Sequence, residues 1–203
     1  MKNASEVIEQ LGDINDILDN IQVLKKLIKA IDGYNEIQKY YEDNKISDEA
    51  FIKKYCSFYQ LRFVSDGFKS TYFAIMQRLR DGEALTFKQI AEELYSVDGK
   101  HQLSLISKLM HTADTDLPVY DSLVAETLAT DPLTPDAGIE QKIAESEVIL
   151  SGISALYAEL KENADFAAAV AEFDGKLPNK ISFVKKCDLI MWSQGAAKKK
   201  NKE

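Results

Sequence analysis

The chain has 203 residues, a net charge of −8 and a hydrophobic fraction of 45%, a composition typical of a folded globular protein of one ordinary domain with or without a helical arm. It has no apolar run of membrane-spanning length and no secretory signal, so we expect a cytoplasmic protein without membrane contact. The acidic balance argues against non-specific coating of nucleic acid but leaves room for a local basic face.

Residues 5 to 31 have the pattern of an amphipathic helix, interrupted near Gly12 and ended by Gly33. Four of its apolar residues recur seven positions apart: Val7, Ile14, Ile21 and Ile28. Such a seam suits another helix. It predicts either packing within the chain or a homodimer or protein partner bound through residues 7 to 31. We assign residues 1–45 to an N-terminal helical extension.

The next segment predicts three helices. The first covers residues 34 to 43, the second starts at Ser47 as its N-cap, and the third runs from Phe68 to Leu79 after a turn at Gly67. The second carries an aromatic stripe at helical spacing, which favours a core position over stacking on nucleic-acid bases. Three basic residues of this region are candidates for contact with DNA: Lys53, Lys54 and Arg62.

A helical hairpin is expected in the middle of the chain. Thr86 is placed to cap its first helix, and a turn containing Gly99 leads to an apolar second helix that carries Lys108. Backbone amides at a helix N-terminus can bind a phosphate where the turn is exposed. Pro118 ends the helical conformation after this second helix, and a new helix begins at Asp121. Asp121 is either only the N-cap of that helix or both its N-cap and a catalytic residue.

The remaining chain predicts helices over residues 139–161, 164–173 and 181–192, followed by a lysine-rich tail, 194–203, that we expect to be disordered. No alternating strand pattern of useful length occurs in the sequence. The predicted class is therefore all-α.

Four phrases of the sequence resemble one superfamily of DNA-repair enzymes. They are Phe58–Arg62, Ser107–Leu109, Leu117–Ser122 and Val184–Ser193. Together they are similar to the helix-hairpin-helix DNA glycosylases, and within them to an uncharacterised bacterial branch that resembles 8-oxoguanine DNA glycosylase-like proteins. The resemblance covers roughly residues 50 to 193. It implies a glycosylase-like helical domain over residues 46–193.

The resemblance implies base excision from double-stranded DNA, in which a carboxylate supports departure of a damaged base. Asp121 falls on that carboxylate. In bifunctional relatives a lysine at the start of the helix after the hairpin attacks the sugar, which here indicates the region of Lys100, with Lys108 two turns further along. The turn residues Gly99, Lys100, His101 and Gln102 would contact the DNA backbone. The family's glycine-rich hairpin is reduced here to Gly99.

Neither cysteine, Cys56 or Cys187, has a metal-ligand or redox spacing, and there are only two histidines. We expect reduced, buried thiols, no structural metal and no cofactor. Two functions are compatible with these patterns. One is a DNA-binding, base-excision glycosylase, with or without lyase activity and with an intact or a degenerate site. The other is a non-catalytic helical protein that keeps the fold and acts through a protein partner.

Overall fold

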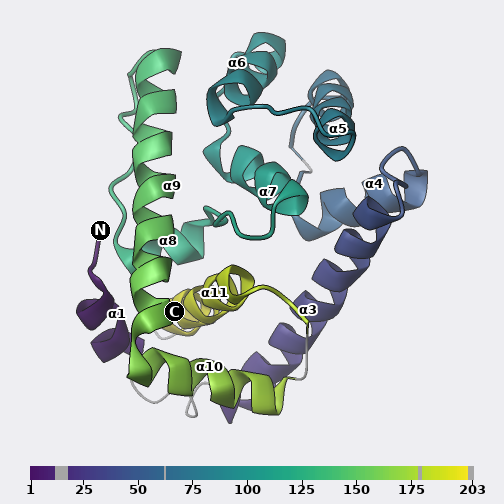
Figure 1. Cartoon of the computed structure of the whole chain (residues 1–203). Helices are drawn as coiled ribbons and strands as arrows, with labels where there is room; N and C mark the ends of the chain where they lie inside the picture. Colours follow the sequence, from purple (N-terminus) through teal and green to yellow (C-terminus); the bar gives the residue numbers. More distant parts are fainter. Residues whose placement is uncertain (12–17, 62, 178–179, 201–203) are drawn as a thin grey trace. The chain divides into compact units, whose positions relative to one another are not determined.

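A computed structural model describes residues 1–11, 18–61, 63–177 and 180–200, and all regular secondary structure in these ranges is α-helical (Figure 1). The all-α prediction is confirmed. No helix in the described part of the chain is long and apolar enough to cross a membrane. In chain order the helices are α1 (Ala4–Leu11), α3 (Ile21–Glu42), α4 (Glu49–Phe58), α5 (Asp66–Arg80), α6 (Phe87–Asp98), α7 (Leu103–Ala113), α8 (Ser122–Leu128), α9 (Ile139–Glu162), α10 (Ala164–Lys176) and α11 (Phe183–Lys200).

Side-chain caps start several helices where the sequence places a short polar residue. Thr86 forms a capping box with Gln89 at the start of α6, which confirms the predicted cap. Ser65 accepts a hydrogen bond from the Phe68 amide at the start of α5. The predicted cap at Ser47 is wrong by one position, because Asp48 is the N-cap of α4.

Gly33 does not end the N-terminal helix, as the sequence suggested, because α3 passes through it and continues to Glu42. The structure gives the reason for a glycine here. A Cβ added at residue 33 would lie 2.8 Å from Cε2 of Phe58 on α4. The glycine therefore permits close packing of two helices, and the separate helix predicted over residues 34 to 43 is the second half of α3.

The chain divides into two compact units, each made of more than one stretch of sequence. Unit 1 comprises Met1–Asp32, Pro118–Pro132 and Ile149–Glu203, and unit 2 comprises Gly33–Leu117 and Leu133–Val148. Both α3 and α9 contribute residues to each unit. Of the predicted seam, Val7 is buried and Ile28 is exposed, and Ile14 lies outside the described residues. The neighbouring apolar residues Leu11, Leu18, Leu27 and Ile31 are buried.

The aromatic stripe of α4 lies in the core of unit 2, as predicted. Tyr55 and Tyr72 are fully buried, and their hydroxyl groups are 3.1 Å apart. Tyr72 donates to the Leu105 carbonyl at 2.7 Å, and the Tyr55 hydroxyl lies 3.2 Å from that of Thr112. This hydrogen bonding satisfies polar groups that would otherwise be costly to bury, and it ties α4 and α5 to α7.

In unit 1, α8 packs closely on α11. A Cβ added at Gly195 would lie 2.7 Å from the Leu123 carbonyl oxygen, so the approach of the two helices depends on this glycine. Gln194 is buried and donates to the Leu11 carbonyl at 2.9 Å. The expected disordered tail is thus wrong for its described part, because α11 continues to Lys200. Residues 201–203 lie outside the described chain.

Candidate functional site

The predicted hairpin turn lies between α6 and α7. Gly99 ends α6 in the left-handed conformation with φ of 67°, which glycine adopts without steric cost. The Lys100 amide donates to the Asp98 carboxylate at 3.0 Å. Gln102 precedes α7, and its side chain makes no capping hydrogen bond with the described residues. The first amides of α7 therefore have no side-chain cap from Gln102.

A pocket of about 410 Å³ opens at this turn. One wall is the loop between α6 and α7 with Tyr95 at the end of α6. The other wall is Ala137 and the first turn of α9. Eight residues line the pocket: Tyr95, Gly99, Lys100, His101, Gln102, Ala137, Ile139 and Lys142. All four turn residues predicted to contact DNA thus surround one cavity. Sequence reasoning missed Lys142, because 42 positions separate it from Lys100.

The α9 wall is held in place by hydrogen bonds within unit 2. The Glu145 carboxylate accepts from the Thr134 amide at 2.9 Å and from the Thr134 hydroxyl at 2.8 Å. These bonds hold the pKa of Glu145 below its usual range. The Lys142 ammonium donates to the Pro135 carbonyl at 2.8 Å. The segment before α9 is therefore fastened to its first turns, which gives the pocket a defined shape.

His101 is neutral in this arrangement. Its Nε2 is 2.7 Å from the Ser146 hydroxyl, which in turn donates to the Lys142 carbonyl at 2.6 Å. Because the hydroxyl has only one hydrogen, Nε2 must carry the proton of the imidazole. Burial, and secondarily the charge of Lys142, lowers the pKa of His101. At neutral pH the positive charge of the pocket therefore comes from Lys100 and Lys142.

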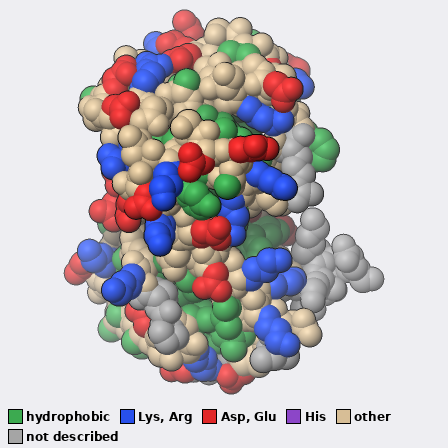
Figure 2. All heavy atoms as spheres, turned by 90° about the vertical axis from the view of Figure 1, so that its right-hand side faces the viewer, with side chains coloured by type: hydrophobic (Ala, Val, Ile, Leu, Met, Phe, Trp, Pro, Cys, Tyr) green, Lys and Arg blue, Asp and Glu red, His purple; other side chains and the backbone are tan. Residues whose placement is uncertain are grey.

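Lys53 and Lys54, which were also predicted to contact DNA, are not among the residues that line this pocket. On α4, Lys53 is exposed and Lys54 forms an ion pair with Glu36. Arg62 lies outside the described residues. On the face drawn in Figure 2, acidic and basic side chains are interspersed rather than gathered by sign.

Lys108 has a very different setting from Lys100. Lys100 is exposed at the turn, whereas Lys108 is only 8% exposed. The Lys108 ammonium donates to the Ser104 hydroxyl at 3.0 Å and lies 5.9 Å from the centre of the Tyr59 ring. These contacts hold the Lys108 side chain against α7 and the aromatic core of unit 2.

In unit 1, Asp121 is the N-cap of α8. Its Oδ1 accepts a hydrogen bond from the Leu123 amide at 3.0 Å, and the residue is half-buried. The predicted cap is confirmed.

Asp188, on α11, is a buried acid that sequence reasoning did not single out. It is 3% exposed. Its Oδ1 accepts from the Tyr157 hydroxyl at 3.1 Å and from the Val119 amide at 3.4 Å, and its Oδ2 lies 3.9 Å from the Lys185 ammonium. Burial raises the pKa of Asp188 to about 7, and the nearby charge of Asp121 adds to the rise. A carboxylate inside the apolar phrase Val184–Ser193 was the available signal.

The described residues contain no group of three or more His, Cys, Asp or Glu side chains that could hold a metal ion. Neither Cys56 nor Cys187 forms a disulfide, and burial raises the pKa of both thiols. Cys187 is buried as predicted, whereas Cys56 is only partly so.

Comparison of the chain with protein-family models, curated proteins and solved structures finds no significant match.

Proposed function

We propose that the chain binds DNA in the manner of a helix-hairpin-helix glycosylase, with a backbone phosphate in the pocket between the α6–α7 turn and the start of α9. The observation that carries this proposal is the cavity itself. It is lined by two lysines, Lys100 and Lys142, and by Gln102, the residue before α7, whose side chain makes no capping hydrogen bond with the described residues. Helix N-termini and lysines are the groups that commonly bind phosphate.

The hydrogen bonds already present determine which donors of the pocket could bind a phosphate. The Lys100 amide is engaged by Asp98 and the Leu105 amide by the Gln102 carbonyl, so the donors left among the described residues are the two ammonium groups and the amides of Leu103 and Ser104. Lys142 uses one of its three hydrogens on the Pro135 carbonyl. The neutral His101 directs its one N–H at Ser146, so it contributes neither a charge nor a hydrogen-bond donor to a ligand in the pocket. An anion is therefore the ligand that this donor set favours.

The chemical part of the proposal rests on Asp121. A carboxylate that stays ionised can stabilise the positive charge that develops on a sugar as its base departs. Asp121 is half-buried, and the Leu123 amide donates a hydrogen bond to its carboxylate at the start of α8, which fixes the position of this oxygen. Its position in the phrase Leu117–Ser122 links it to the resemblance described above.

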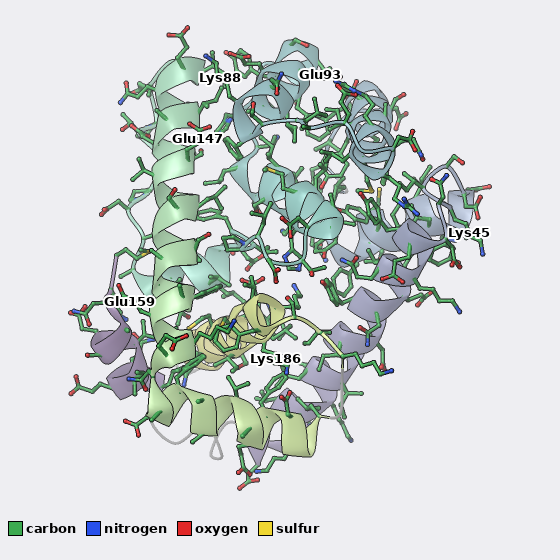
Figure 3. All side chains as sticks on the ribbon, viewed as in Figure 1. Lys45, Lys88, Glu93, Glu147, Glu159 and Lys186 are labelled. Carbon is green, nitrogen blue, oxygen red and sulfur yellow. The ribbon has the colours of Figure 1, made fainter. Side chains whose placement is uncertain are left out.

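Binding can be tested with fluorescent duplexes and the variants Lys100→Ala, Lys142→Ala and the double variant. Lys45→Ala is the control, because Lys45 is an exposed, ion-paired lysine of unit 2 that Figure 3 shows well to the side of α9. Each pocket variant should weaken binding and lower the salt slope by about one. Wild-type affinity and salt slope in the double variant would overturn the pocket assignment.

Base release can be tested on a panel of lesion-containing duplexes with Asp121→Asn. Asparagine caps helices as well as aspartate does, so the variant keeps α8 but loses the charge. We expect it to lose at least 10²-fold in rate, the usual order for loss of an electrostatic group. Asp116→Asn, at an exposed acid in the preceding loop, should leave the rate unchanged. An Asp121→Asn rate equal to wild type would contradict the chemical role.

A further inference from the structure

We propose that Asp188 is a positioning residue for Asp121, because its buried carboxylate accepts the hydrogen bond of the Val119 amide, in the chain segment that delivers the Asp121 carboxylate. This inference rests on the proposed function for its effect on base release. The coupling between the two carboxylates can be measured without DNA.

The positioning contact is made through the backbone. Asp188 accepts the hydrogen bond of the Val119 amide, and Val119 is buried two residues before Asp121. Pro118 lacks an amide hydrogen and α8 begins only at Ser122, so this short extended segment obtains little support from helical hydrogen bonds. The contact with α11 thus fixes the direction in which the chain enters α8.

The second half of the contact fixes Asp188 itself. Tyr157, on α9, donates to the same oxygen, Oδ1, that receives the Val119 amide. The other oxygen, Oδ2, is buried and makes no hydrogen bond to the described residues, with only the Lys185 ammonium at 3.9 Å. Oδ1 therefore accepts both hydrogen bonds that hold the neighbouring segments, and Oδ2 can carry the proton when Asp188 is neutral.

The electrostatic environment of Asp188 comes from three segments of unit 1. Lys185 and Cys187 lie on α11, Tyr157 lies on α9, and Asp121 lies before α8. Burial raises the pKa of Asp188 to about 7, with Lys185 and the two hydrogen bonds acting in the opposite direction. The charge near Asp121 thus changes over the neutral pH range.

The arrangement of the two oxygens allows position and charge to be separated. Asp188→Asn keeps one carbonyl oxygen, which can still accept from both Tyr157 and Val119, but it cannot ionise. Asp188→Leu removes both hydrogen bonds. Asp174→Asn is the matched control, because Asp174 on α10 forms a partly exposed ion pair with Lys186 of α11 at 2.7 Å (Lys186 is labelled in Figure 3).

For positioning, we expect Asp188→Leu to lower base release about 10²-fold, the usual effect of displacing a catalytic group by about 1 Å. Asp188→Asn should restore the rate at pH 6 to within about threefold of wild type and should lack the wild-type change of rate across pH 7. DNA affinity should be unchanged in both. Equal rates in Asp188→Leu and wild type would overturn the positioning role.

The closing experiment follows the Asp121 carboxyl carbon by NMR from pH 5 to pH 8.5 in the full chain without DNA. In wild type and in Asp174→Asn the signal should shift with a midpoint of about 7, the pKa of Asp188, and in Asp188→Asn this step should vanish. A wild-type signal without the step, or a step that persists in Asp188→Asn, would overturn the inference. This titration contains no DNA, so its result does not depend on base release. If the wild-type chain released no base in the separate assay, that would refute the proposed function but not the contact between Asp188 and the segment before Asp121.

Discussion

The Tyr157 hydroxyl donates to Asp188 Oδ1 at 3.1 Å, and the two side chains are 2% and 3% exposed. Burial, followed by the charge of Asp188, raises the pKa of Tyr157. The pair joins α9 to α11 in the core of unit 1 and, through the Val119 amide, to the segment before α8. Burial makes Asp188 expensive to ionise despite its polar neighbours, so this acid makes the stability of the fold depend on pH.

The first prediction concerns that dependence. The folded-state pKa of Asp188 is about 7, above the value of about 3.9 in an unfolded chain, so the folded chain holds this proton more tightly. The stabilisation from Asp188 is therefore present at low pH and is lost as the pH rises from about 4 to about 7.

Asp188→Asn should remove this contribution. Urea unfolding of both proteins at pH 5 and pH 8 should show that wild type loses about 1–3 kcal/mol more than the variant between the two values. The difference between the proteins isolates Asp188 from the other titrating groups. An identical loss in both would contradict the assigned pKa.

Gly33→Ala should destabilise the protein although alanine is the better helix former. The new Cβ would lie 2.8 and 2.9 Å from two ring carbons of Phe58. Overpacking of this kind costs about 1–3 kcal/mol, which exceeds the gain of about 1 kcal/mol in helix propensity. Gly175→Ala is the control, because nothing lies within 4 Å of its added Cβ, and it should be neutral or stabilising by thermal unfolding. Stabilisation by Gly33→Ala would mean that Phe58 does not press on α3.

Gly195→Ala should be more damaging than Gly33→Ala. Its Cβ would meet the Leu123 carbonyl oxygen at 2.7 Å, and backbone cannot swing aside as a ring can. We expect a loss of about 2–3 kcal/mol in the free energy of unfolding, measured by urea denaturation. A neutral result would show that α11 does not pack on α8 at this position.

Ser146→Ala should weaken the wall of the pocket. It removes the acceptor for His101 Nε2–H, which leaves a partly buried donor unsatisfied. Such a loss costs about 1–3 kcal/mol in the free energy of unfolding. Ala144→Ser, at an exposed position on the same helix, is a surface control and should change stability by less than about 0.5 kcal/mol. Equal stability of Ser146→Ala and wild type would contradict a stabilising His101–Ser146 hydrogen bond.

The sequence predicted the fold class, most helices and the caps at Thr86 and Asp121, because helical periodicity and capping are local properties. It failed where glycine serves packing rather than chain reversal. The sequence indicated that Gly33 ends a helix and that Gly195 lies in a disordered tail. In the structure each lies within a helix, at a close approach to another segment. Only the partner, Phe58 or Leu123, distinguishes the two roles.

The sequence located only the part of the candidate site that lies in one local stretch of chain. The turn at Gly99 was found from one contiguous stretch of sequence, whereas Lys142 and Asp188 reach their neighbours only through the tertiary fold. Their partners, such as Pro135 for Lys142 and Val119 for Asp188, carry no charge pattern that a sequence would show. The burial that sets the pKa of Asp188 is likewise a property of the packed chain.

The most direct test of DNA binding at the hairpin pocket is the affinity of the wild-type chain for two fluorescent duplexes, one intact and one with an abasic-site analogue, at 50 and 200 mM salt. We expect tighter binding to the abasic duplex and affinities that fall as salt rises. Absence of binding to either duplex at the lower salt would contradict the account and direct attention to a protein partner.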